Sequence, residues 1–240
     1  MKIKVVSDYA ELSVKSAKIT AEYINANPEK LICFAAGHTQ FGTFRELVDM
    51  QGRGEVDLSS VYYVQLDEWI GLAPNDEGAC FQMLTDNFFK SANISPERIY
   101  AFDGLSDDLE SQCRMMENRI NQHGGIGFAL LGVGLNGHIG FNEPNAPNTA
   151  GCFTIALDDT TKTVSSKYFG KSLSVQMGIT IGWKTLLESS EILLQASGET
   201  KAAVIKEAVQ GEITVNLPAS LLQNHKNTTV ILDNCAASML

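Results

Sequence analysis

Short apolar stretches rich in β-branched residues recur along the chain, and amphipathic segments separate them. Several of these stretches lack polar alternation, which is typical of strands covered on both faces. They predict six strands, at residues 2–7, 31–37, 61–69, 128–134, 191–197 and 228–234. Because helical patterns lie between them, we expect crossover connections and a mainly parallel sheet with helices on both faces.

Capping signals mark the starts of the predicted helices. Asp8 with Glu11 forms a capping box after the first predicted strand. Ser106 precedes the acidic first turn of a second helical pattern, LESQCRMMENRINQ. A third pattern, KAAVIKEAVQ, is opened by Gly198 or Thr200. The alternation of strands and helices predicts an α/β protein with a modified Rossmann-like fold.

No repeat, low-complexity segment or Pro/Ser-rich linker divides the sequence. We therefore expect residues 1–240 to form a single domain. Residues 145–176 differ from the rest, because they are polar and only weakly periodic. Such a segment is typical of a loop that covers a site, so we predict a small mobile lid there.

Composition and charge exclude several classes of partner. With 44% hydrophobic residues, the chain of 240 residues is able to bury a substantial core. No stretch approaches the roughly 18 to 20 apolar residues of a membrane helix, and the N-terminus does not resemble a signal peptide. A net charge of −10 argues against nucleic acid as a partner, because binding its phosphates requires a cationic face. A small phosphorylated ligand is compatible with this charge, since backbone N–H groups and one or two cations can hold it.

The five cysteines are scattered and odd in number, and they form no C-x-x-C pair. This spacing indicates neither a disulfide framework nor a zinc site. A reducing cytoplasm is the compartment that fits such cysteine usage best.

The segment GVGLNGHIGFNEP, at residues 132–144, contains glycines spaced as G-x-G-x-x-G after a predicted strand. In a dinucleotide-binding Rossmann unit, a long helix begins at the third glycine and faces a pyrophosphate. Here Gly140 and Pro144 leave room for barely two turns of helix after Gly137. The glycine spacing is therefore weak evidence for a nicotinamide enzyme.

Polar side chains cluster instead at the ends of three predicted strands. Asn136, His138 and Glu143 follow one strand, and Asp67 and Glu68 follow another. Carboxylates that emerge from a buried strand require partners or a chemical task. The third strand runs into the turn AAGHTQFGTF, whose N–H groups are suited to a phosphate. Because ligands of open α/β sheets bind at this end of the strands, the three clusters predict one site.

Taken together, these motifs resemble the glucosamine-6-phosphate deaminase/isomerase family. AAGHTQFGTF resembles its phosphate turn, LDEWIGL its catalytic-base motif, GVGLNGHIGFNEP its ring-opening motif and GETKAAVIKEAVQG its lysine-bearing helix start. The motifs occur in the family's order, and the similarity covers nearly the whole chain. The tryptophan of LDEW and the segment LPASLLQNH look closer to the galactosamine-6-phosphate branch of the family.

The resemblance implies acid–base roles for several residues. Asp67 is the general base that moves a proton between C1 and C2 of the open-chain sugar. His138 opens the pyranose ring by exchanging a proton with the ring oxygen, a task suited to an imidazole at neutral pH. Glu143 orients His138 and stabilises its cation. Asn136 stands where some family members have aspartate, so we expect it to act as a neutral hydrogen-bond partner.

The resemblance also implies how the phosphate is held. The backbone of the glycine turn and two lysines are expected to bind it: Gly37, His38, Thr39, Lys167 and Lys201. Lys167 aligns with an arginine of the family and lacks the bidentate fork of that side chain. Glu68 and Gly137 are expected to lie in the same pocket, and no residue is assigned to a metal.

The expected reaction converts galactosamine 6-phosphate or glucosamine 6-phosphate into the ketohexose 6-phosphate and ammonia, without metal or organic cofactor. Whether the chain forms a homo-oligomer is left open. One alternative is a 6-phosphogluconolactonase, which shares the sheet and has a GHT version of the histidine motif; the glutamate of GHIGFNEP favours the deaminase. The other is a non-catalytic sugar-phosphate sensor, which has no need of the acid pair and the histidine.

Overall fold

The computed structural model describes residues 1–165, 168–169 and 175–240. In these residues, a parallel sheet has the strand order β1-β10-β9-β6-β2-β3-β5. Its strands are β1 (Lys2–Val6), β2 (Leu31–Phe34), β3 (Tyr62–Gln65), β5 (Ile99–Tyr100), β6 (Ile126–Leu131), β9 (Glu191–Ala196) and β10 (Thr228–Asp233). Each predicted apolar stretch overlaps one of them, so the prediction of a mainly parallel sheet is confirmed. Strand β5 is not among the predicted strands, because its two residues carry no periodicity.

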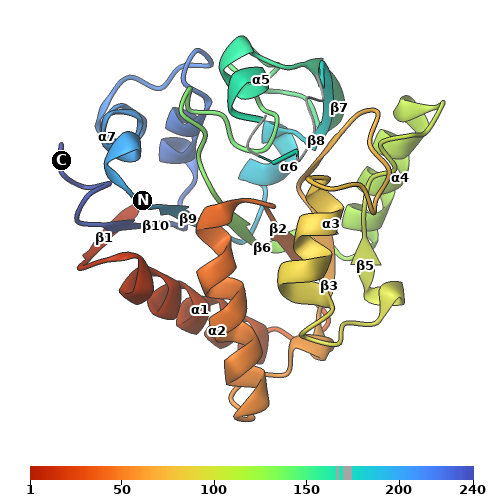
Figure 1. Cartoon of the computed structure of the whole chain (residues 1–240), viewed down its shortest axis with the longest axis horizontal. Helices are drawn as coiled ribbons and strands as arrows, with labels where there is room; N and C mark the ends of the chain where they lie inside the picture. Colours follow the sequence, from red (N-terminus) through yellow and green to blue (C-terminus); the bar gives the residue numbers. More distant parts are fainter. Residues whose placement is uncertain (166–167, 170–174) are drawn as a thin grey trace.

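Helices cover both faces of this sheet (Figure 1). Alternate residues of β2 belong to different cores: Ile32 and Phe34 to one, Leu31 and Cys33 to the other. The first core includes α1 (Tyr9–Ala26), α2 (Phe41–Gly52) and the π-helical turn Thr85–Phe89, and the second includes α4 (Leu109–Gln122), α6 (Trp183–Leu187) and α7 (Ala202–Gln210). Burial on both faces explains why the strands have apolar sequences without alternation.

Side-chain caps begin the first two predicted helices. The Asp8 carboxylate accepts a hydrogen bond from the Glu11 N–H (2.9 Å), so the predicted cap at Asp8 is confirmed. The Glu11 carboxylate accepts the N–H of Ser7 (2.8 Å), one residue before the Asp8 N–H of a regular capping box. Asp108, rather than Ser106, caps α4, because its carboxylate accepts an N–H of the first turn (2.8 Å). A short 3₁₀ turn that begins after Gly198 leads into α7, as predicted.

The predicted strand at 61–69 is two strands that belong to two different sheets. The second sheet is antiparallel, in the order β4 (Asp67–Trp69), β8 (Met177–Ile181) and β7 (Cys152–Ala156). Leu66 joins the sheets: its N–H donates to the Phe34 carbonyl in the large sheet (3.1 Å), and its carbonyl accepts an N–H from β8 (2.9 Å). This junction places Asp67 where the two sheets meet.

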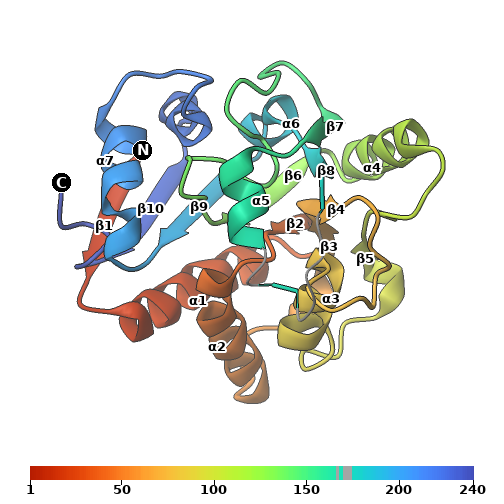
Figure 2. The ribbon, with the colours of Figure 1, turned by 45° about the horizontal axis from the view of Figure 1, so that its top comes forward.

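Residues 145–176 contain more regular structure than their weak periodicity indicates. Strand β7 and helix α5 (Asp159–Ser165) lie in this segment. Figure 2 shows α5 beside the loops that follow β2 and β6. Strand β7 has no clear apolar pattern because its residues are exposed or only partly buried. The mobility of the segment as a lid stays a prediction.

No helix among the described residues is both long and apolar enough to cross a bilayer. The five cysteines are free thiols in the structure. Cys33 and Cys80 are buried among apolar side chains, so packing accounts for them.

Candidate active site

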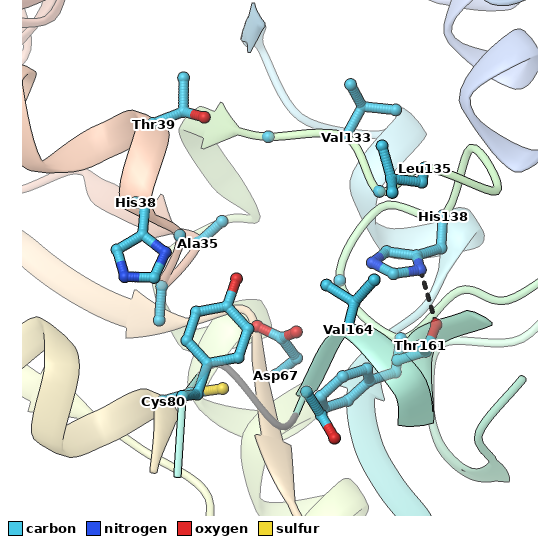
Figure 3. A pocket seen from close by; sticks show the side chains of 18 of the residues that line it. Ala35, His38, Thr39, Asp67, Cys80, Val133, Leu135, His138, Thr161 and Val164 are labelled. Atoms are coloured by element: carbon cyan, nitrogen blue, oxygen red, sulfur yellow. Dashed lines mark hydrogen bonds between the residues drawn. The ribbon is translucent and has the colours of Figure 1, made fainter. Parts of the chain in front are cut away.

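The connections of the large sheet change direction between β2 and β6. The chain continues from β2 to β3 on one side, and from β6 towards β9 on the other. Such a switch point leaves a crevice at the carboxyl ends of the strands, where α/β proteins bind ligands. A cavity of about 250 Å³ lies there. In Figure 3, His38 and Thr39 lie on one side of it, His138 and Thr161 on the other, and Asp67 between them.

Asp67 lies at the base of this cavity, at the junction of the two sheets, and is 8% exposed. Burial, together with the nearby carboxylates of Glu68 and Glu143, raises the pKa of Asp67 to about 8. A carboxyl group that titrates near neutral pH is able both to take and to return a proton. Asp67 thus has the position and the chemistry that a general base requires.

Glu68 does not line the cavity, so its expected place in the pocket is wrong. Neighbouring residues of a strand point to opposite faces, and Glu68 of β4 points away from Asp67 towards α3 (Cys80–Leu84). One of its carboxylate oxygens accepts the N–H groups of Trp69 (2.8 Å) and Cys80 (2.9 Å). The other accepts from the Phe81 N–H (2.9 Å) and the Gln65 amide (2.8 Å). Glu68 therefore holds the start of α3 against the sheet junction.

The glycines after β6 shape the loop that carries His138. A Cβ atom on Gly134 would lie 2.4 Å from the His138 ring, so the imidazole packs against bare backbone. Gly137 has a φ of +84°, and a Cβ atom there would lie 2.5 Å from Leu217. Gly137 does not line the cavity, which corrects its expected place in the pocket. The loop continues without a helix, in agreement with the sequence argument against a dinucleotide turn.

His138 faces a buried hydrogen-bond network. Its Nδ1 lies 3.0 Å from the Thr161 hydroxyl and 3.4 Å from an oxygen of Glu143, which is 2% exposed. Burial alone raises the pKa of Glu143, but hydrogen bonds from His138, Thr161 and Asn136 outweigh it and lower the pKa. The Asn136 amide donates to Glu143 (3.0 Å) and to Asp158 (3.2 Å). Asn136 is thus a neutral hydrogen-bond donor to two carboxylates, and Glu143 supplies the negative charge beside His138.

The turn after β2 forms the opposite wall of the cavity. Gly37, His38 and Thr39 line it, and helix α2 begins two residues later, so the helix N-terminus lies close by. The His38 ring stacks on Tyr168, with ring centroids 5.0 Å apart. Lys201 also lines the cavity, and its ammonium group donates to the Val133 carbonyl (2.6 Å). The other expected cation, Lys167, lies outside the described residues.

Several lining residues are absent from the sequence-based assignment: Trp69, Cys80, Met83, Thr161 and Tyr168. Trp69 is the one with a local signal, because it follows the acidic pair directly. The others lie in segments without a recognisable motif: Cys80 and Met83 reach the cavity from α3, Thr161 from α5, and Tyr168 from the chain after α5. Within the described part of the chain, no group of three or more His, Cys, Asp or Glu side chains is arranged to hold a metal ion.

Fold and site define an α/β protein with an acid–base centre at the switch point of its sheet. A profile of the glucosamine-6-phosphate isomerases/6-phosphogluconolactonase family matches residues 8–231. The chain belongs to this family. It is 38% identical over its full length to a glucosamine-6-phosphate deaminase of Clostridium acetobutylicum and 37% identical to one of Halothermothrix orenii, and it covers 100% of both.

Solved structures show the same relationship. A monomeric glucosamine-6-phosphate deaminase superposes with a TM-score of 0.96 at 34% identity, with 100% of both chains covered. The 6-phosphogluconolactonase of Trypanosoma brucei superposes with a TM-score of 0.81 at 17% identity, covering 100% of this chain and 98% of its own. This second likeness extends to the fold alone.

Proposed function

We propose that the protein is an amino-sugar-6-phosphate deaminase that isomerises its substrate to the ketohexose 6-phosphate and releases ammonia. The observation that carries this proposal is that buried Asp67 and His138 line one cavity with the turn at 37–39 and Lys201, and that the Glu143 carboxylate lies 3.4 Å from His138 Nδ1. Its relatives named glucosamine-6-phosphate deaminase support the same reaction.

In the proposed reaction, the turn at 37–39 and Lys201 hold the phosphate. His138, with Glu143 as its anionic partner, takes the proton of the C1 hydroxyl and gives it to the ring oxygen as the bond between C1 and that oxygen breaks and the pyranose opens to the aldehyde. Asp67 then takes the proton from C2 and returns it to C1, and the C1 oxygen takes a proton from the substrate's ammonium group. These transfers convert the 2-ammonio aldehyde into a ketose iminium, and addition of water at C2 followed by loss of ammonia gives the ketose.

The test is ammonia release from glucosamine 6-phosphate and galactosamine 6-phosphate, assayed side by side without added metal. We expect release from at least one sugar. Since the chain resembles the galactosamine branch, the proposed preference is for galactosamine 6-phosphate. Hydrolysis of 6-phosphogluconolactone without ammonia release would replace the deaminase by the lactonase, and tight binding without turnover would replace it by a sensor.

The site is proposed to act on a free sugar phosphate in a reducing, cytoplasmic compartment. The five free thiols support such a compartment, since oxidising environments favour paired cysteines. The net charge of −10 supports a small ligand over nucleic acid.

Lys201→Met is expected to raise KM for the sugar phosphate by about 10- to 100-fold, with a smaller effect on kcat. The reason is that Lys201 is the one lysine or arginine among the described residues that line the cavity, and a hydrogen bond to a charged group contributes about 1.5–3 kcal/mol. Steady-state kinetics and inhibition by inorganic phosphate measure the effect. Lys226→Met, at an exposed position, is the matched control. An unchanged KM and unchanged inhibition by phosphate would remove Lys201 from the phosphate site.

A further inference from the structure

Helix α5 contacts the His138–Glu143 pair through a residue to which the proposed reaction assigns no role. Thr161, 4% exposed, lies on the first turn of α5. Its hydroxyl is 3.0 Å from His138 Nδ1, closer than the nearest Glu143 oxygen at 3.4 Å (Figure 3). A buried hydroxyl beside the ring nitrogen therefore competes with the carboxylate as its partner.

The hydroxyl of a helical threonine can donate to the carbonyl four residues earlier. Thr163, on the same helix, does this, donating to the Asp159 carbonyl (2.8 Å). Thr161 bonds to His138 instead. The position of its hydroxyl thus follows the histidine rather than its own helix.

Hydrogen-bond chemistry fixes the direction of this contact. A hydroxyl has one hydrogen to donate and lone pairs that accept, whereas an ionised carboxylate only accepts. The Glu143 oxygen 3.4 Å from Nδ1 therefore favours a hydrogen on that nitrogen. The Thr161 oxygen, 3.0 Å from Nδ1, has lone pairs that accept the same hydrogen. In Figure 3 the other ring nitrogen points into the pocket.

We propose that Thr161 is a positioning residue that, with Glu143, keeps the hydrogen of neutral His138 on Nδ1 and leaves Nε2 to exchange protons with the sugar. The tautomer of His138 is inferred from the hydrogen-bond geometry at Nδ1. The expected effect of Thr161 on turnover rests on the proposed function.

A second contact fixes the turn that carries Thr161. Asp158, which precedes α5, accepts the Thr160 N–H (2.8 Å) and the Asn136 amide (3.2 Å) through one carboxylate oxygen. The same Asn136 amide group donates to Glu143 (3.0 Å). The Asn136 amide therefore links the start of α5 to Glu143, and this link holds Thr161 close to the His138 ring.

Thr161→Val removes the hydroxyl with little change of shape, and Thr161→Ser keeps it. For cyclic amino-sugar phosphate, we expect Thr161→Val to lower kcat by about 10- to 100-fold with KM within about threefold, and Thr161→Ser to stay within about threefold of the wild type. Thr163→Val, at an exposed position of the same helix, is the control and should behave as the wild type. Equal kcat for Thr161→Val and the wild type would overturn the proposal.

The tautomer is read directly by ¹⁵N NMR of histidine-labelled, ligand-free protein at a pH where the rings are neutral. His138→Gln identifies the His138 signals. We expect the Nδ1–H form in the wild type and in Thr161→Ser, and loss of that preference in Thr161→Val. A wild-type ring in the Nε2–H form would overturn the inference even if Thr161→Val fails to fold. Because this measurement needs no substrate, a protein with the expected tautomer but no ammonia release would refute the proposed function alone.

Discussion

Asp67→Asn is expected to lower kcat by about 100- to 10,000-fold while the protein still binds sugar phosphate. Asparagine keeps the size of the side chain at the base of the cavity but has no basic oxygen to take the C2 proton. Ammonia release measures turnover, and calorimetric titration with the unreacted substrate measures binding. Asp49→Asn, an exposed position on α2, is the matched control and should leave both unchanged. Wild-type turnover in Asp67→Asn would remove this residue from the mechanism.

The same carboxyl group predicts a pH profile. With a pKa of about 8, Asp67 is mostly protonated in the free protein at neutral pH. Since the base is the ionised form, kcat/KM should rise with pH up to about 8 and level off above it. A profile already flat from pH 6 upwards would contradict this assignment.

Asp67 also links pH to stability. Its folded-state pKa of about 8 lies above the ordinary value, because burial favours the neutral carboxyl. Its contribution to stability is therefore complete below about pH 3.9, the unfolded value, and is lost as pH rises to about 8. The asparagine of Asp67→Asn does not titrate, so this pH-dependent loss of stability is absent from the variant. In urea titrations, the free energy of unfolding of Asp67→Asn relative to the wild type should therefore increase by a few kcal/mol between pH 5 and pH 8.5. A constant difference across this range would indicate an exposed carboxyl.

The large sheet could be predicted from the sequence because its strands are covered on both faces and therefore stand out as continuous apolar stretches. The small sheet could not. Strand β7 is partly exposed, and β4 continues the apolar stretch of β3 without a break, so only the hydrogen bonds of Leu66 to two different sheets reveal the boundary. The sequence pattern therefore indicates which residues are buried, but it does not indicate where the chain passes from one sheet to the other.

The residues of the site also fall into two groups, those that local sequence motifs predict and those that only the packing of the chain reveals. Motifs bring Asp67, His138 and Glu143 to one edge of the sheet, and the structure places them together. Glu68 was expected beside Asp67 because the two are adjacent in sequence, yet strand alternation sends it to the opposite side. Thr161 lies 23 residues from His138, and its contact depends on where α5 packs. No local pattern encodes that placement.

Glu68→Ala is expected to destabilise the protein by about 4 kcal/mol or more, because the carboxylate is a structural acceptor. The N–H groups of Trp69, Cys80 and Phe81 and the Gln65 amide all donate to it, and the residue is 1% exposed. Each buried donor left without an acceptor costs about 1–3 kcal/mol, and neighbouring losses do not add fully. Such a change removes a large share of the roughly 5–15 kcal/mol that stabilises a typical domain.

Chemical denaturation of Glu68→Ala, Glu68→Gln and the control Glu97→Ala separates structural support from a role in the pocket. Glu97 is exposed, so its removal should change stability by about 0.5 kcal/mol or less. Glu68→Gln keeps one accepting oxygen and places an amide against the remaining donors, so its loss should be intermediate. If Glu68→Ala kept wild-type stability and lost only turnover, the carboxylate would act on the substrate. The hydrogen bonds that hold α3 predict the reverse, with the activity lost in proportion to the unfolded fraction.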